Sequence, residues 1–160
     1  MSCLRGLHET TVSYSNPFAL TYSRTKATAG GSKLQVMIVE DRPGVLATIE
    51  AMVESWREAD ITSVDGFTNA SAWIKAVDHL DLLLCDVRLP GKMDGLELAG
   101  MAVAAYPSIA IVMFSADPRW EIDGLLERHS FLRKPFGRDA LIAQIDDAFL
   151  RVRKPVSLPG

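Results

Sequence analysis

From Lys33 onward the chain alternates short apolar runs with longer amphipathic stretches, and this alternation occurs five times. The apolar runs predict buried strands at residues 34–41, 60–67, 81–86, 108–115 and 130–134. The amphipathic stretches predict helices at residues 45–56, 69–77, 95–106, 118–128 and 138–152. Because crossovers between parallel strands are right-handed, this order predicts an α/β fold with a doubly wound, five-stranded parallel sheet covered by helices on both faces.

Length and composition leave room only for short segments outside this domain. The 160 residues, 48% of them hydrophobic and 23% charged, suit one globular domain of ordinary size. Residues 1–32 are rich in Ser, Thr, Ala and Gly, lack periodicity and predict a disordered N-terminal extension. We therefore expect one domain at residues 33–153 and a C-terminal tail at 154–160.

The charge and the hydropathy argue against two classes of partner. A net charge of −3 does not suit direct binding to nucleic acid, because such proteins usually carry a concentrated basic surface. Apolar runs stay well short of the roughly 18 residues that span a membrane, and the first residues lack the apolar core of a secretory signal. We expect a soluble, cytoplasmic protein with no membrane partner.

The cysteines and histidines do not form a recognisable site. Cys3 and Cys85 are far apart, so neither a disulfide scaffold nor a metal cluster is indicated. Cys85 lies inside an apolar run and is interpreted as a small core residue rather than a redox switch. His8, His79 and His129 have no metal-binding or catalytic spacing.

Polar and charged side chains stand where the predicted strands end, and the carboxyl ends of parallel strands meet at one edge of a sheet. They are Glu40 and Asp41 at the end of the first strand, Asp86 at the end of the third, Ser115 at the end of the fourth, and Lys134, followed by Pro135, at the end of the fifth. Three carboxylates held close together repel one another, so we expect a hard divalent cation between them. Mg²⁺ is the natural candidate because it prefers oxygen ligands.

The segments IVED, LLLCDVRLPGKMDG, MFSAD and FLRKPF, in this order and spacing, resemble the receiver domain of two-component response regulators. The resemblance covers about residues 34–152 and keeps the four segments in register with the five predicted strands. It implies a flavodoxin-like (βα)5 fold with strand order 2-1-3-4-5. It also implies a phosphorelay function, with a histidine kinase or a histidine phosphotransfer protein as partner.

The same resemblance assigns roles to the residues at the strand ends. It makes Asp86 the phosphoacceptor, a carboxylate nucleophile that takes a phosphoryl group in a Mg²⁺-dependent reaction. Asp41, Glu40, Asp86 and the backbone carbonyl of Arg88 would hold the metal ion. Lys134 would pair with a phosphoryl oxygen, or with Asp86 before phosphorylation.

Three further residues complete the implied site. Ser115 would donate a hydrogen bond to the phosphoryl group and, together with Phe131, would act as the switch that reports phosphorylation to the surface. Pro135, which often follows a cis peptide bond in this family, would fix the loop that carries Lys134. The simpler interpretation of Phe131 is an ordinary buried strand residue.

One stretch departs from the family pattern. Ser115 and Lys134 are separated by 19 positions, about three fewer than expected, and Arg128, His129 and Ser130 replace the usual small residues before the fifth strand. We therefore expect the helix at 118–128 to be short or displaced. This argues against the family's usual dimerisation through that face and leaves at most a weak homodimer.

Arg88 and Asp117 each lie two residues beyond a site residue, Asp86 and Ser115 respectively. They should therefore flank the phosphorylation site from two different loops. An ion pair between them could cover the phosphoryl group and restrict attack by water. The simpler alternative is two solvated loop charges, worth under about 1 kcal/mol.

Because eight residues remain after Val152, we expect no output domain after the predicted receiver. We expect a single-domain response regulator that signals by contact with another protein, and not an enzyme acting on an independent substrate. One alternative is a receiver-like interaction module that works without phosphorylation. A second is a phosphatase with an aspartyl nucleophile, although such enzymes need an acid at the position that Arg88 occupies here.

Overall fold

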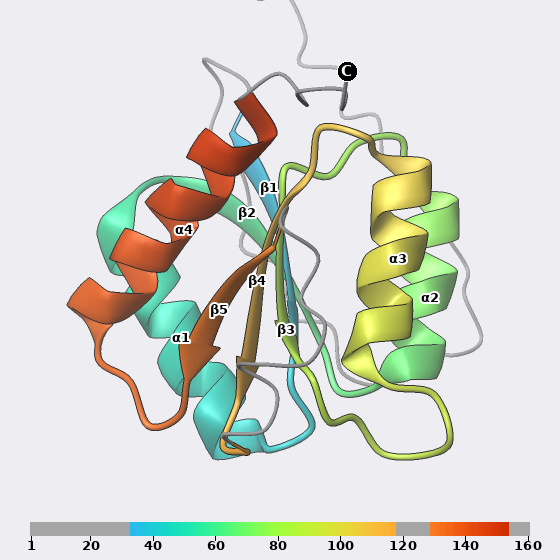
Figure 1. Ribbon diagram of the computed structural model, residues 1–160, viewed down its shortest axis with the longest axis horizontal. Coiled ribbons are helices and arrows are strands. Elements are labelled where there is room, and N and C mark those ends of the chain that lie inside the picture. The colour runs from blue at the N-terminus through green and yellow to red at the C-terminus, as the bar shows by residue number, and fades with distance from the viewer. Residues whose placement is uncertain (1–32, 118–128, 154–160) are drawn as a thin grey trace, which may run out of the picture.

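The computed structural model describes residues 33–117 and 129–153, and within them five strands form one parallel sheet (Figure 1). The strands are β1 (Leu34–Val39), β2 (Ala59–Val64), β3 (Leu82–Asp86), β4 (Ala110–Ser115) and β5 (Ser130–Arg133). Their order is β2-β1-β3-β4-β5, and each adjacent pair is parallel. The predicted fold class and strand order are confirmed.

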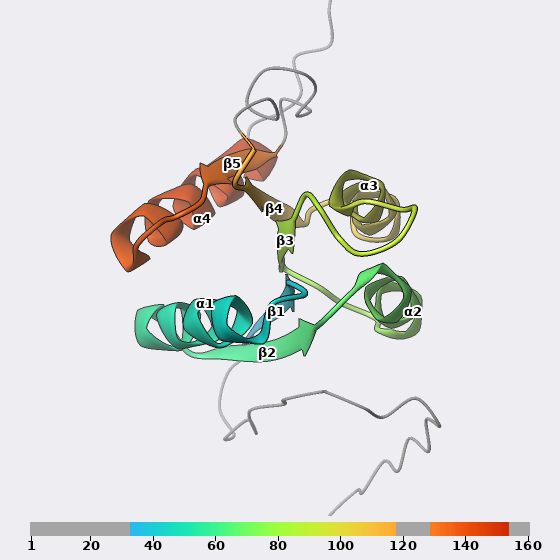
Figure 2. The same ribbon diagram turned by 90° about the horizontal axis from the view of Figure 1, so that it is seen from below.

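Four helices cover the sheet in the described part of the chain: α1 (Pro43–Trp56), α2 (Phe67–Ala76), α3 (Gly95–Ala105) and α4 (Arg138–Arg153). Figure 2 shows α1 and α4 on one face of the sheet and α2 and α3 on the other. Residues 33–117 and 129–153 contain no helix that is both long and apolar enough to cross a membrane.

Each face of the sheet has its own hydrophobic core, and neighbouring residues of a strand contribute to opposite cores. In β1, Met37 and Val39 belong to the core under α2 and α3, whereas Val36 and Ile38 belong to the core under α1 and α4. This alternation follows from the two-residue period of a strand. Because both faces are covered, the strands need apolar side chains at nearly every position, which is why they appear as continuous apolar runs.

Most predicted boundaries differ from the structure by one or two residues, and the end of the second strand differs by three. The second strand ends at Val64 rather than at residue 67, because Gly66 caps α2 in an extended conformation and Phe67 is already helical. The fourth strand begins at Ala110 rather than at 108, because a turn ends α3 and Ile109 N–H donates to the Tyr106 carbonyl at 3.0 Å. The helix expected at 118–128, with its predicted shortening, and the tails at 1–32 and 154–160 lie outside the described residues.

The start of α3 is determined by local hydrogen bonds. The Asp94 side chain accepts hydrogen bonds from the N–H groups of Leu96 and Glu97, and the Glu97 side chain accepts one from the Asp94 N–H. This capping box satisfies N–H groups that have no partner within the helix. It places α3 directly after the loop that leaves β3, and so close to the carboxyl edge of the sheet.

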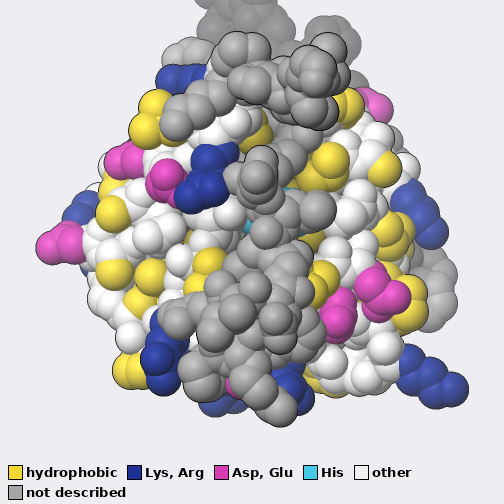
Figure 3. Space-filling model, in the orientation of Figure 1, with side chains coloured by type: hydrophobic (Ala, Val, Ile, Leu, Met, Phe, Trp, Pro, Cys, Tyr) yellow, Lys and Arg dark blue, Asp and Glu magenta, His cyan; other side chains and the backbone are white. Residues whose placement is uncertain are grey.

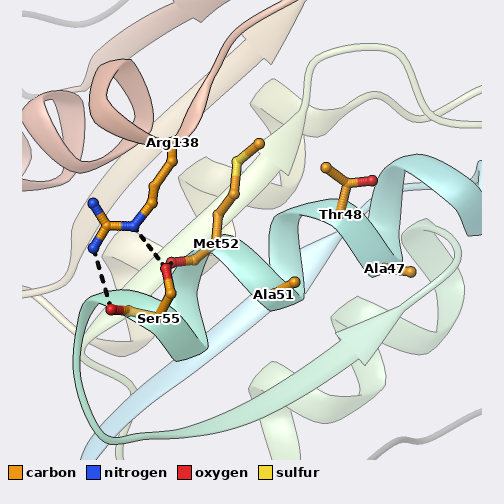
Figure 4. A pocket seen from close by; sticks show the side chains of 6 residues that line it. All are labelled: Ala47, Thr48, Ala51, Met52, Ser55 and Arg138. Carbon is orange, nitrogen blue, oxygen red and sulfur yellow. Dashed lines mark hydrogen bonds between the residues drawn. The ribbon is translucent and has the colours of Figure 1, made fainter.

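Arg138 joins the start of α4 to the end of α1 (Figure 4). Its guanidinium donates to the Ser55 hydroxyl at 2.7 Å and to the Ser55 carbonyl at 3.2 Å. The carbonyl is one of those left without a helical partner at the end of α1, so the contact caps that helix. Beside it lies a shallow groove lined by Ala47, Thr48, Ala51, Met52, Ser55 and Arg138.

Candidate functional site

The register of the sheet brings the predicted site residues to one edge. Val39 pairs with Cys85, Asp86 with Phe114, and Ser115 with Arg133. The residues that end or follow these strands are therefore neighbours, although up to 94 positions separate them along the chain. The predicted convergence at the carboxyl edge is confirmed for Glu40, Asp41, Asp86, Ser115 and Lys134.

Three carboxylates form the centre of the site. One oxygen from each of Glu40, Asp41 and Asp86 lies within 4.8 Å of the others. Glu40 is fully buried and Asp86 is 6% exposed, whereas Asp41 is exposed to solvent. Such a group offers oxygen ligands only, which suits a hard divalent cation such as Mg²⁺. The residues present therefore fit the metal ion that the sequence predicts.

Lys134 compensates part of this negative charge. Its ammonium Nζ donates to Asp86 Oδ2 and, at 2.5 Å, to Glu40 Oε2. It also lies 5.1 Å from the centre of the Phe114 ring, a cation–π distance. The backbone contributes to this position, since Lys134 N–H donates to the Ser115 carbonyl at 2.9 Å and the Lys134–Pro135 peptide bond is cis.

Glu40 has a larger part in the site than the sequence suggested. We expected it only among the residues that would hold the metal ion, but it also accepts a hydrogen bond from Lys134. Arg42, which the sequence analysis overlooked, also approaches it, with N–H donating to Glu40 Oε1 at 3.0 Å and the guanidinium Nε at 3.7 Å from the same oxygen. The only sequence signal for Arg42 was its place directly after two acids.

Ser115 and Asp86 each accept a hydrogen bond from a residue two positions further along. Asp86 Oδ1 accepts from the Arg88 N–H at 2.8 Å, and Ser115 Oγ accepts from the Asp117 N–H at 3.0 Å. The side chains of these two residues meet, with Arg88 Nη2 at 3.0 Å from Asp117 Oδ2. Arg88 and Asp117 thus form the ion pair that one of the two interpretations expected, while the Arg88 side chain stays 63% exposed to solvent. Whether this pair covers a phosphoryl group stays a prediction.

A cavity of about 450 Å³ opens at this edge of the sheet. It is lined by Asp41, Arg42, Asp86, Arg88, Ser115, Ala116 and Asp117. A water molecule takes up about 30 Å³ in the liquid. The cavity can therefore hold a phosphoryl-sized anion together with a hydrated cation beside the Asp86 carboxylate.

Cys85 and Phe131 belong to the hydrophobic packing next to the site. Cys85 is fully buried, and its thiol donates to the Asp86 carbonyl at 3.2 Å. Burial, and then the negative charge of Asp86, raise the pKa of the Cys85 thiol well above its usual value, which suits a core residue. Phe131 is half-buried and packs against the core under α2 and α3. Whether it acts as a switch remains a prediction.

His79 and His129 are not among the residues of the carboxylate group. His79 Nε2 lies 2.7 Å from Asp81 Oδ1, next to the point where Asp81 joins β1 and β4 through backbone hydrogen bonds to Gln35 and Ala110. His129 is buried directly before β5.

A parallel sheet in this order, with an acidic group and a lysine at its carboxyl edge, defines the receiver domain of two-component signalling. The family model described as "Response regulator receiver domain" matches residues 36–146, and the chain belongs to this family. The chain is also similar to the nitrogen assimilation regulatory protein NtrX of Azorhizobium caulinodans, with 29% identity over 127 residues, 76% of this chain. The match spans only 28% of that relative.

Solved structures show the same fold. A response regulator receiver protein from Sinorhizobium medicae WSM419 is similar with a TM-score of 0.67 and 21% identity, over 76% of this chain and 98% of that chain. The receiver domain of the sensor histidine kinase PA1611 from Pseudomonas aeruginosa PAO1 is similar with a TM-score of 0.61 and 25% identity, over 74% of this chain and 97% of that chain. That structure has a magnesium ion coordinated in its active-site cleft.

Proposed function

We propose that this receiver domain accepts a phosphoryl group on Asp86 from a phosphohistidine of a histidine kinase or a histidine phosphotransfer protein, in a Mg²⁺-dependent reaction. The observation that carries the proposal is the contact of Lys134 Nζ with Asp86 Oδ2 and Glu40 Oε2 beside the three-carboxylate group. It supplies an acceptor oxygen, a cation for the incoming anion and a donor set for a metal ion in one cavity. The cytoplasmic location stays a prediction from the sequence.

The reaction forms a bond between phosphorus and an Asp86 carboxylate oxygen. It breaks the bond between phosphorus and the histidine ring nitrogen of the donor, which then takes a proton from solvent. Lys134, which already donates to Asp86, is in place to pair with a phosphoryl oxygen. When bound among Glu40, Asp41, Asp86 and the Arg88 carbonyl, Mg²⁺ supplies the positive charge that neutralises the transferred group.

Ser115 and Phe131 would transmit phosphorylation of Asp86 to the surface of the domain. The hydroxyl of Ser115 lies in the same cavity as Asp86, so it can turn to donate to a phosphoryl oxygen. Phe131 lies on β5 next to β4 and is only half-buried, and we propose that it turns further inward when Ser115 moves. We propose that the resulting change in packing alters the surface around β5 and α4, which a downstream protein reads.

We propose a signalling role rather than turnover of an independent substrate, and contact with a protein rather than with nucleic acid. Figure 3 shows the face of the molecule that is turned to the viewer in Figure 1. Over its described part, acidic and basic side chains are interspersed with apolar ones. A mixed surface of this kind differs from the concentrated basic surface of a typical nucleic-acid binder. A weak homodimer and the identity of the effector stay predictions.

The test is phosphorylation of the full chain by acetyl phosphate with Mg²⁺, read by intact mass. We expect the wild type to gain one phosphoryl group and Asp86→Asn to gain none. Asp139→Asn is a matched control, because Asp139 is an exposed carboxylate at the start of α4 and not part of the carboxylate group. Phosphotransfer from a panel of phosphorylated histidine kinases would then identify the donor.

Three results would contradict the proposal. If Asp86→Asn gains the group as readily as the wild type, Asp86 is not the acceptor. If the wild type takes no phosphoryl group from small donors or kinases, the chain is an interaction module that works without phosphorylation. Steady hydrolysis of a generic phosphate ester, abolished in Asp86→Ala, would instead indicate a phosphatase.

A further inference from the structure

The Phe114 ring is a third neighbour of the Lys134 ammonium group. In the part of the chain that the structure describes, this ammonium contacts the carboxylates of Asp86 and Glu40 and the Phe114 ring, whose centre lies 5.1 Å from Nζ. The face of an aromatic ring carries partial negative charge and attracts a cation. The Lys134 side chain is only 9% exposed, so water screens this attraction little. The ring is therefore a partner of the ammonium as well as a part of the core.

The sheet places this ring beside the Asp86 carboxylate. Phe114 lies opposite Asp86 in the register of β3 and β4, and its carbonyl accepts from the Val87 N–H at 2.9 Å. Its side chain is fully buried in the core under α1 and α4. The Phe136 ring packs against it, with ring centres 5.7 Å apart and ring planes inclined by 57°. This packing restrains the Phe114 ring in its position next to Lys134.

The proposed reaction changes two of the three contacts and leaves the ring unchanged. Phosphorylation would turn one Asp86 oxygen into the bridging oxygen of an acyl phosphate. Asp86 and Glu40 would also share oxygen lone pairs with a bound metal ion. Both changes reduce the negative charge that the carboxylates offer to Lys134. The Phe114 ring takes part in neither change, so its attraction for the ammonium persists through the reaction.

We propose that Phe114 is a positioning residue, whose ring holds the Lys134 ammonium beside Asp86 while the carboxylates are engaged by the metal ion and the phosphoryl group. The proposal rests on the proposed function. The ring keeps the ammonium close enough to pair with a phosphoryl oxygen as the donor approaches. An aliphatic side chain of similar size would fill the core but has no negative face to hold a cation. The role therefore depends on the aromatic character of Phe114 and not on its volume.

The first test varies the electron density of the ring at nearly constant shape. Phe114 is replaced in the full chain by mono-, di- and trifluorinated phenylalanine, because each fluorine weakens the negative face of the ring. The rate of phosphorylation by acetyl phosphate with Mg²⁺ should fall stepwise along this series. With three fluorines it should reach about a fifth of the wild-type rate, which corresponds to about 1 kcal/mol.

The same fluorinated residues at Phe136 are the matched control, since the Lys134 ammonium lies over the Phe114 ring and the Phe136 ring packs against that ring. They should leave the rate unchanged. Phe114→Leu should slow phosphorylation more than Phe136→Leu, although both lower the free energy of unfolding, which urea unfolding measures. A rate that is constant along the Phe114 series, or that falls equally in both series, would overturn the proposal.

Nuclear magnetic resonance tests the placement of Lys134 without phosphorylation. Protons above an aromatic ring are shifted upfield, so the methylene protons next to Lys134 Nζ should resonate upfield of those of Lys92, an exposed lysine. The shift should persist when Mg²⁺ is added and should vanish in Phe114→Leu. Its loss on addition of Mg²⁺ would show that the ammonium leaves the ring, which overturns the proposal while phosphorylation of Asp86 still stands. A wild type that shows the shift but takes no phosphoryl group would overturn the proposed function instead, so the two failures are distinguishable.

Discussion

Gly95, the first residue of α3, packs directly against the backbone carbonyl of Asp86, and a Cβ atom at Gly95 would lie 2.0 Å from that oxygen. The contact is held by the Gly95 N–H, which donates to the Val87 carbonyl at 2.8 Å. Because the obstacle is backbone and not a flexible side chain, a larger residue must displace the end of β3. The position of α3 and the position of Asp86 are therefore coupled.

Gly95→Ala should accordingly lower the free energy of unfolding by about 2–3 kcal/mol, as overpacking against a rigid neighbour does. Urea unfolding measures this change, and phosphorylation by acetyl phosphate should slow in the variant. Gly100→Ala is the matched control, since it lies in the same helix and its Cβ would meet nothing within 4 Å. It should stabilise the protein by about 0.5–1 kcal/mol, because alanine favours a helix over glycine. Equal effects of the two substitutions would show that the contact is not tight.

Lys134→Met should destabilise the metal-free protein by about 3 kcal/mol, because it leaves the carboxylates of Glu40 and Asp86 buried without their shared cation. Mg²⁺ should restore more stability in this variant than in the wild type, since the metal ion no longer competes with an ammonium. Thermal unfolding in EDTA and in Mg²⁺ compares the two. Lys92→Met, an exposed lysine, should behave as the wild type. A smaller magnesium effect in Lys134→Met would mean that Lys134 does not oppose the metal ion.

Asp41→Asn should weaken Mg²⁺ binding about tenfold, equivalent to about 1.4 kcal/mol, because it removes one charged oxygen ligand from a group of three. The shift of the unfolding temperature with Mg²⁺ concentration measures this affinity without any phosphoryl donor. Asp139→Asn should leave the titration unchanged. Identical titrations of Asp41→Asn and the wild type would place the metal ion elsewhere.

In a Cys3→Ser background, the Cys85 thiol should resist alkylation in the native protein at pH 8 and react only on unfolding. Burial and the charge of Asp86 raise its pKa, so little thiolate forms. Because the pKa is raised in the folded state, this group contributes stability that is lost as the pH rises above about 9, the usual value of a thiol. The stability difference between wild type and Cys85→Ala should shrink over that range. Rapid native alkylation would contradict this account.

The strands could be located from the sequence because both faces of the sheet are covered. Leu82, Leu83 and Leu84 are all fully buried, and a run of this kind is visible without knowing its neighbours. The boundaries were less certain at Phe67, where an aromatic residue continues an apolar pattern although Gly66 has already ended the strand. Local pattern does not distinguish the last residue of a strand from the first of a helix.

The sequence by itself determined which residues reach the carboxyl edge, because parallel strands deliver Glu40, Asp86, Ser115 and Lys134 there whatever their exact spacing. Only the tertiary structure decided how they meet: that Lys134 joins Glu40 to Asp86, that Arg88 pairs with Asp117, and that Gly95 packs on the Asp86 carbonyl. The physical reason is distance along the chain. Strand formation depends on neighbouring residues, whereas these contacts depend on the register of separate strands and on side-chain directions, which only the packed fold sets.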